Sequence, residues 1–164
     1  MKLTLFTDYA MRTLLYLGAR PERLCSIGEV AQAYRISQNH LMKVVVELVR
    51  SGHVESVRGR SGGIRLGMPP EQINVGAVVR HTEDGFDLVD CGSCVVAPAC
   101  GLTGVLKEAL AAFMAVLDRY TLADLLAKRA DIAAIFASRE IGAPDAPAPA
   151  ASKRSREPAL QKET

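Results

Sequence analysis

The strongest constraint on the fold is a pair of short helical segments separated by only a few residues. The first begins at Ser26, where Ser26 and Glu29 form an S-x-x-E capping box, and it is expected to run to about Ala33. The second begins at Ser37, again with an apolar residue before the cap. Two short helices joined by so tight a turn are typical of a helix-turn-helix.

The segments on either side of this pair complete a small helical unit. Apolar positions at helical spacing predict an amphipathic helix near the start of the chain, ending near Gly18: Leu3, Phe6, Ala10, Thr13, Leu14 and Leu17. Cys25 precedes the Ser26 cap, where a hydrophobic staple needs an apolar side chain, so we expect Cys25 to be structural. Residues 74–83 predict a short helix that closes the domain.

The start of the second helix of the pair carries side chains that can read DNA. In a helix-turn-helix this end enters the major groove. Here it presents Ser37, Gln38, Asn39 and His40, with Lys43 one turn further on. A Gln or Asn amide can pair with adenine at two points, and a lysine neutralises a phosphate. A polar first turn is also ordinary on any exposed helix. The helix alone therefore does not distinguish a DNA-reading segment from an ordinary exposed one.

Directly after these helices, two short strand-like runs flank a glycine-rich turn. The turn contains Arg58, Gly59, Arg60, Ser61, Gly62 and Gly63. Glycines permit the backbone angles of a tight turn, and arginines at its tip have no core to stabilise. A hairpin in this place is typical of a wing that reaches the DNA backbone or the minor groove. A solvated hairpin, charged for solubility, is the alternative.

Charge is distributed as a DNA-binding domain requires. Residues 1–80 contain 11 Lys and Arg against 6 Asp and Glu, whereas residues 81–140 contain 5 against 9. The basic front half is therefore the part expected to face a polyanion. We assign residues 1–83 to a winged helix-turn-helix DNA-binding domain.

Three of the four cysteines lie within ten residues, in a segment that glycines and a proline keep irregular. These are Cys91, Cys94 and Cys100, and we interpret residues 84–101 as a cluster-binding loop. Thiolates on a flexible loop can converge on a soft metal centre. Both zinc and an iron–sulfur cluster take four ligands, so one must come from elsewhere, for example His81 for zinc. Spacing alone leaves zinc, a cluster and a thiol–disulfide switch open.

Residues 102–137 predict a long dimerisation helix followed by short C-terminal helices. One apolar face comprises Leu102, Leu106, Ala109, Phe113, Val116 and Tyr120, and a second strip comprises Leu110, Met114 and Leu117. One strip can cover the chain's own domain, which leaves the other for a partner and predicts a homodimer. Burial of one wide face within a monomer is the alternative. Thr121 caps the next short helix, and the amphipathic pattern ends near Ala137.

The remaining residues, 138–164, are rich in Pro, Ala and charge, and we expect a disordered tail. The expected fold class is therefore mainly α. No apolar run approaches the ~18 residues of a membrane span, and the start lacks a secretory signal, so we expect a cytoplasmic protein without a membrane partner. Catalytic motifs are missing, so we do not expect an enzyme. An electron carrier is the rival class, because cluster-binding thiols serve that role too.

The motifs together resemble a known family. They are LTLFTDYAMRTLLYL, SQNHLMKVV, VRGRSGGIRLG, CVVAPACGL and DRYTLADLL, and they span residues 1 to about 137. The sequence is similar to the winged-helix iron–sulfur transcription regulators, and among them to the nitric-oxide-sensing repressors. In another branch the fourth cluster ligand is a histidine three residues after the last cysteine, and here that position is Thr103.

The resemblance implies that Cys91, Cys94 and Cys100 bind an iron–sulfur cluster, of the 4Fe–4S type or alternatively 2Fe–2S. It also implies that Asp8 is the fourth ligand, donated by the other subunit. From the residues alone, Asp8 reads as a helix-start carboxylate favoured by the helix dipole. Arg12, one turn beyond Asp8, is expected to pair with that carboxylate when the cluster is absent.

The function that the resemblance implies is a repressor that binds operator DNA as a cluster-loaded homodimer. Nitric oxide would nitrosylate the cluster and release the DNA, which de-represses genes of nitric-oxide detoxification. Two alternatives stay within the winged-helix class. One is a zinc- or thiol-based redox-responsive regulator, and the other is a regulator that reports iron–sulfur status.

Overall fold

The computed structural model of the chain describes residues 2–141. In this part the chain is mainly helical, with one two-stranded sheet, as predicted. In chain order the elements are α1 (Leu5–Gly18), α2 (Ile27–Tyr34), α3 (Gln38–Arg50), β1 (Val54–Val57), β2 (Gly63–Leu66), η1 (Pro70–Gln72), α4 (Val75–Thr82), η2 (Ala97–Ala99), α5 (Leu102–Leu117), α6 (Leu122–Leu125) and α7 (Arg129–Ile141).

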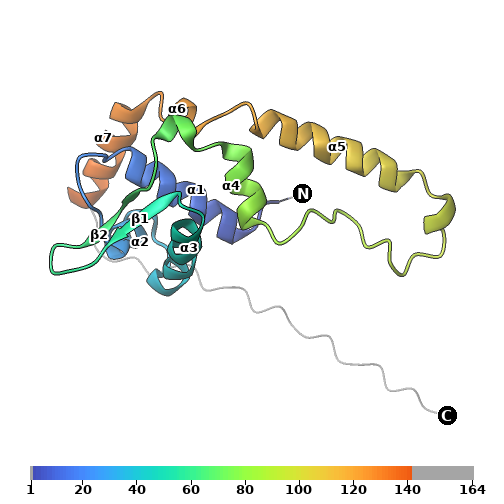
Figure 1. Ribbon diagram of the computed structural model, residues 1–164, viewed down its shortest axis with the longest axis horizontal. Coiled ribbons are helices and arrows are strands. Elements are labelled where there is room, and N and C mark those ends of the chain that lie inside the picture. The colour runs from blue at the N-terminus through green and yellow to red at the C-terminus, as the bar shows by residue number, and fades with distance from the viewer. Residues whose placement is uncertain (1, 142–164) are drawn as a thin grey trace, which may run out of the picture.

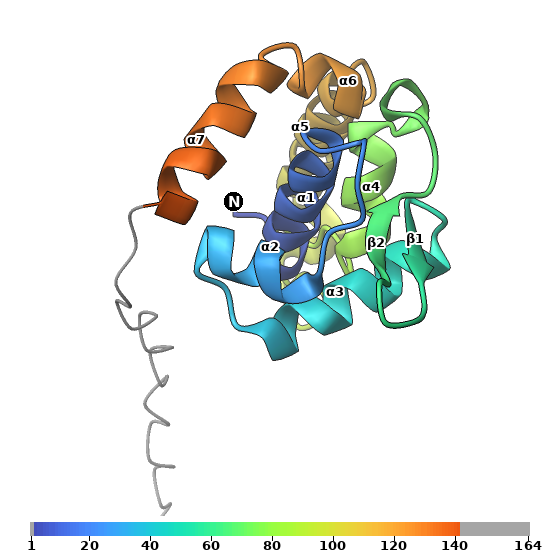
Figure 2. The ribbon, with the colours of Figure 1, turned by 90° about the vertical axis from the view of Figure 1, so that its left-hand side faces the viewer.

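Helix α1 lies at the centre of the domain, with the other elements arranged around it (Figure 2). The Thr4 side chain caps it by accepting a hydrogen bond from the Thr7 backbone N–H at 3.3 Å. Four of the predicted apolar positions are buried, namely Ala10, Thr13, Leu14 and Leu17. Tyr16, which the prediction did not include, is buried as well, and the predicted Leu3 lies before the first residue of the helix. The helix ends at Gly18, where a Cβ would collide with the Leu126 side chain that packs there.

The predicted helix-turn-helix is formed by α2 and α3. Both hydrogen bonds of the capping box are present, from the Glu29 N–H to Ser26 Oγ at 3.1 Å and from the Ser26 N–H to Glu29 Oε2 at 2.8 Å. Helix α2 ends at Tyr34, and Arg35 takes the left-handed conformation with φ 57°. That residue turns the chain toward α3.

Replacing Arg35 by glycine is expected to stabilise the fold by about 0.5–1 kcal/mol. The left-handed region costs a residue with a Cβ about 1–2 kcal/mol, and the larger entropy loss of glycine offsets only part of this gain. The measurement is the free energy of unfolding in urea. Arg35→Ala is the matched control, because it removes the same side chain and keeps the Cβ. Equal stability of the two variants would contradict the prediction.

Strands β1 and β2 form the predicted hairpin, paired antiparallel with Val54 opposite Leu66. Cys25 adds a third segment to its edge through two hydrogen bonds with Ile64, at 3.0 and 2.8 Å between N and O atoms. The Cys25 side chain is fully buried within the apolar core. Its position agrees with the structural role expected from the sequence.

Helix α5 runs outward from the rest of the molecule, and the loop of residues 84–101 leads from the end of α4 to its start (Figure 1). Of the residues of α5 only Met114 is buried, whereas Leu102, Val105 and Val116 are 51%, 62% and 44% exposed. After α6, the chain returns to the domain as α7. Phe136 of α7 packs against Tyr16 and Tyr34, with ring centroids 4.9 and 5.2 Å apart.

The end of the chain differs from the expected boundary. Helix α7 continues to Ile141, beyond the predicted limit near Ala137. The predicted tail spans residues 138–164, and its part from residue 142 onward lies outside the described residues. Between residues 2 and 141, no helix has both the length and the apolar character needed to cross a membrane.

Candidate nucleic-acid interface and metal centre

The recognition helix presents its predicted residues to solvent. Helix α3 and the hairpin β1–β2 lie side by side (Figures 1 and 2). The inner face of α3 is buried and comprises Leu41, Val44, Val45 and Leu48. The side chains predicted to read DNA are all exposed: Ser37, Gln38, Asn39, His40 and Lys43. Ser37 makes no capping hydrogen bond with its side chain, so its hydroxyl is available to a ligand.

The tip of the hairpin is built by glycines that the backbone requires. Gly59 has φ 123°, a conformation that L side chains rarely adopt. A Cβ at Gly62 would collide with the carbonyl oxygen of Val57, and one at Gly63 would lie 2.7 Å from the carbonyl oxygen of Cys25. Arg58, Arg60 and Ser61 are exposed around this turn.

The hairpin is also braced by an ion pair that the sequence analysis did not identify. Glu55 and Arg65 lie opposite each other in the register of β1 and β2. The Arg65 Nε donates to Glu55 Oε2 at 2.9 Å. No motif in the sequence marks Arg65 as part of a pair. The register of the two strands shows that it lies opposite Glu55. The pair lies across the stem of the wing, and because both side chains are about half exposed it adds little to the stability of the hairpin.

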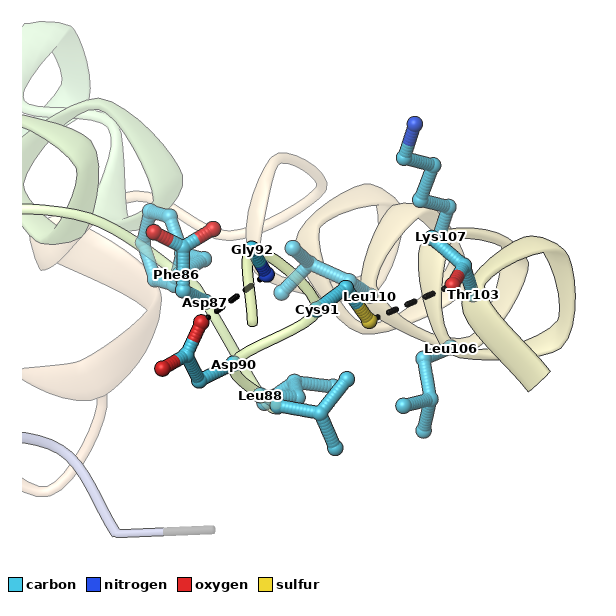
Figure 3. A pocket seen from close by; sticks show the side chains of 11 residues that line it. Phe86, Asp87, Leu88, Asp90, Cys91, Gly92, Thr103, Leu106, Lys107 and Leu110 are labelled. Atoms are coloured by element: carbon cyan, nitrogen blue, oxygen red, sulfur yellow. Dashed lines mark hydrogen bonds between the residues drawn. The ribbon is translucent and has the colours of Figure 1, made fainter. Parts of the chain in front are cut away.

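The cysteine loop packs locally against the first turns of α5 (Figure 3). A pocket there is lined by residues that include Phe86, Leu88, Cys91, Thr103, Leu106 and Leu110. The Cys91 Sγ lies 3.4 Å from the Thr103 hydroxyl oxygen. Cys94 is exposed and Cys100 is half-buried. Successive turns set their spacing, because the Cys94 N–H bonds to the Cys91 carbonyl at 3.4 Å and the Cys100 N–H to the Ala97 carbonyl at 3.3 Å.

The single chain does not bring the predicted metal ligands together. Across residues 2–141, no three or more His, Cys, Asp or Glu side chains are grouped so that they could hold a metal ion. None of the four cysteines takes part in a disulfide in the described part of the chain. The donor chemistry nevertheless suits iron, because the loop offers three thiols, one exposed and two half-buried, on a segment whose only regular element is the short η2. A tetrahedral centre needs a fourth donor that this loop does not supply.

The Asp8 carboxylate is held by Arg12 in this structure. The Arg12 Nε donates to Asp8 Oδ1 at 2.9 Å, and Nη2 lies 2.8 Å from Oδ2. The predicted contact between these two residues is therefore present, and its dependence on a cluster stays a prediction. The Arg12 guanidinium also lies 5.6 Å from the ring centroid of Tyr34, the last residue of α2. Both members of the pair are about two-fifths exposed, so water competes with it.

Four consecutive residues at the end of α4 form contacts that no sequence pattern predicts. We call this group, Arg80, His81, Thr82 and Glu83, the α4 junction. Thr82, which belongs to the junction, and Thr7 of α1 are both buried. Their Oγ1 atoms lie 2.9 Å apart. The partners are separated by tens of residues in the sequence. No periodicity or motif marks such long-range pairs.

The histidine at the start of β1 makes stability depend on pH. Burial, and then the nearby His81, lower the pKa of His53 below its ordinary value of 6.5. The unfolded chain therefore takes up this proton first as the pH falls, so the contribution of His53 to stability decreases below about pH 6.5. We expect His53→Gln to reduce the loss of unfolding free energy between pH 7.5 and pH 5.5. Urea denaturation at both pH values tests this, and an identical loss in both proteins would contradict it.

The fold and the two sites define a class of protein. A helix-turn-helix followed by a hairpin with a cationic tip is the architecture of a winged-helix DNA-binding protein. The sequence profile of the Rrf2 family, described as "Iron-dependent Transcriptional regulator", matches residues 3–128. The chain belongs to the Rrf2 family. Members of this family are transcriptional regulators, which agrees with the expectation that the chain is not an enzyme.

Relatives with high sequence identity carry one name. The HTH-type transcriptional regulator NsrR of Bacillus subtilis (strain 168) is 53% identical over 146 residues, covering 85% of this chain and 100% of that protein. The protein of the same name from Bacillus licheniformis is 52% identical over 132 residues, covering 77% and 92%. Both relatives carry the name NsrR and are described as HTH-type transcriptional regulators, so the resemblance of the motifs to this group of regulators is confirmed.

Solved structures share the fold. The structure titled "T. potens IscR" has a TM-score of 0.65 at 27% identity, covering 78% of this chain and 88% of that one. The structure of CymR (YrzC), described as the global cysteine regulator of B. subtilis, has a TM-score of 0.62 at 27% identity, covering 78% and 98%. The winged-helix prediction is thus confirmed by the structure and its neighbours.

Proposed function

We propose that the chain is a transcriptional repressor that binds operator DNA as an iron–sulfur-loaded homodimer and releases it in response to nitric oxide. One observation carries this proposal. The chain combines an exposed DNA-reading surface with a loop of three free thiols that lacks a fourth ligand, and it holds Asp8 only in an exposed ion pair. A partner subunit that donated Asp8 would complete the site and join the two reading surfaces.

The proposed ligands are Cys91, Cys94 and Cys100 of one subunit and Asp8 of the partner subunit. When bound, the cluster, of the 4Fe–4S or alternatively the 2Fe–2S type, supplies an iron with a weak oxygen ligand that is open to nitric oxide. Arg12 holds the Asp8 carboxylate in the single chain, so it competes with the cluster for that carboxylate. Because the pair is exposed and is worth only about 0.3–0.5 kcal/mol, Asp8 is free to leave it.

The outward helix supports the homodimer. Leu102, Val105 and Val116 leave much of their apolar surface on α5 in contact with water in the single chain. Exposed large apolar side chains on one helix are typical of an interaction site. A twofold dimer would place two recognition helices on half-sites about one helical turn apart.

The reading surface has distinct chemical roles for its residues. Gln38 and Asn39 can pair with adenine edges, with Ser37 and His40 beside them, and Lys43 can neutralise a phosphate. The wing arginines, Arg58 and Arg60, are placed to reach the backbone or a minor groove, on a turn completed by Ser61, Gly62 and Gly63. The double-stranded operator is therefore contacted by both the helix and the wing.

The test combines spectroscopy with DNA binding. Protein purified without oxygen is expected to show visible absorption, and it is used to select its operator from a library of random duplexes. Nitric oxide should then bleach or alter that absorption and lower operator affinity by about 5- to 150-fold. DNA binding that is unchanged by loss of the chromophore would overturn the proposed switch. A colourless protein that responds to zinc chelation or to thiol oxidation would favour the zinc- or thiol-based alternative.

A further inference from the structure

The α4 junction is clamped to the start of α1 by three hydrogen bonds. Its Glu83 carboxylate accepts bonds from the Thr4 backbone N–H at 2.8 Å and from the Thr4 hydroxyl at 3.1 Å. The third bond joins the buried Thr82 and Thr7 hydroxyls. Thr7 is adjacent to Asp8, and Glu83 is the residue before the cysteine loop begins. The junction therefore joins the helix that carries Asp8 to the root of the loop.

The same turn is bound to the end of the outward helix. The Arg80 guanidinium donates two hydrogen bonds to the Asp118 carboxylate, each 2.6 Å long. Asp118 is the C-cap residue directly after α5. Planar two-point pairing of this kind fixes orientation as well as distance. The two ends of the segment formed by the loop and α5 are thus both held at this one turn.

The remaining residue of the junction reaches the recognition helix. The His81 Nε2 lies 2.9 Å from Glu47 Oε1, and the other oxygen of that carboxylate accepts from Arg50 Nη1 at 3.0 Å. The His81 and Glu47 side chains are 34% and 26% exposed, so the contact is partly shielded from water. Glu47 lies on α3, two turns beyond the residues predicted to read bases.

We propose that His81 and Glu47 are positioning residues that carry the state of the cysteine loop from α4 to the recognition helix. This inference rests on the proposed function, because it assumes that the loop has two states. Movement at the beginning of the cysteine loop, at the start of α1 or at the end of α5 acts on the α4 junction, because all three contact it. The His81–Glu47 bond is a side-chain link from that turn to α3.

The test compares operator affinity in the cluster-loaded and cluster-free states for three variants. His81→Leu removes the bond, and we expect it to lower the ratio of the two affinities by about threefold to tenfold. His81→Arg supplies N–H donors that can reach the Glu47 carboxylate and should restore the ratio. Arg23→Gln breaks an ion pair of similar length, 2.7 Å to Glu29, that does not involve α4, and it should leave the ratio unchanged.

A second measurement separates positioning from general stabilisation. Hydrogen exchange of the α3 amides should change on cluster loading in the wild type and change less in His81→Leu. Glu47→Ala removes the acceptor and provides a second variant, with the same expected fall in the ratio, in case His81→Leu does not fold. If His81→Leu weakens both states equally, or keeps the wild-type ratio, the inference is wrong. If the wild type itself binds DNA equally in both states, the proposed function fails instead.

Discussion

Replacing Asp8 by alanine is expected to abolish the difference in operator affinity between cluster-loaded and cluster-free protein. Under the proposed function, this carboxylate binds the cluster of the partner subunit. Its loss should therefore eliminate the roughly 5- to 150-fold difference in operator affinity, about 1–3 kcal/mol, that we expect between the two states. The fold should be little affected, because the Asp8 side chain is 39% exposed and bonds to the equally accessible Arg12. The cost in unfolding free energy is expected to be below about 1 kcal/mol.

The control for this prediction is the other member of the pair. Arg12→Gln removes the competitor for the carboxylate and keeps Asp8, so cluster retention should be equal to or greater than in the wild type. The measurements are visible absorption, operator affinity by fluorescence anisotropy and unfolding in urea. An Asp8→Ala protein that keeps the full wild-type difference in affinity would show that the carboxylate is not a ligand.

The second large effect is expected at the tip of the wing. Gly62→Ala places a Cβ against the carbonyl oxygen of Val57 and 2.9 Å from that of Gly59. Neither contact can be relieved by a side-chain rotation, so the turn must open and carry Arg58 and Arg60 away from the DNA. We expect operator affinity to fall by at least about tenfold, which corresponds to roughly 1.4 kcal/mol.

Salt dependence separates shape from charge in this prediction. Arg60→Gln keeps the turn and removes one cation, so it should reduce the slope of log affinity against log salt by about one. Gly62→Ala should also weaken binding while the thermal unfolding midpoint stays close to that of Arg60→Gln. Wild-type affinity in Gly62→Ala would mean that the wing does not contact the operator.

Much of the architecture is local and was therefore readable in the sequence. The capping box at Ser26 and Glu29 and the helix end at Gly18 each depend on residues a few positions apart. The hairpin followed from glycines between strand-like runs. The pairing of Asp8 with Arg12 followed from their spacing of four residues on one helix. For these features the chain itself sets the distance between the interacting groups.

The long-range contacts could not be read in this way. Thr7 and Thr82 are ordinary polar residues in the sequence, and only their burial together shows that each satisfies the other's hydroxyl. The same is true of Glu83 with Thr4 and of His81 with Glu47. The sequence offered His81 as a zinc ligand, whereas the structure gives it a carboxylate partner on α3.

The family resemblance, the helix-turn-helix, the wing and the grouping of three thiols were determined by the sequence alone, because each depends on neighbouring residues. Tertiary structure decided that α5 leaves the domain with its apolar side chains exposed. It also decided that one turn of α4 touches α1, α3 and the end of α5. These facts depend on how helices pack across long sequence separations, where burial of apolar surface fixes the arrangement and polar side chains take the partners that packing places beside them.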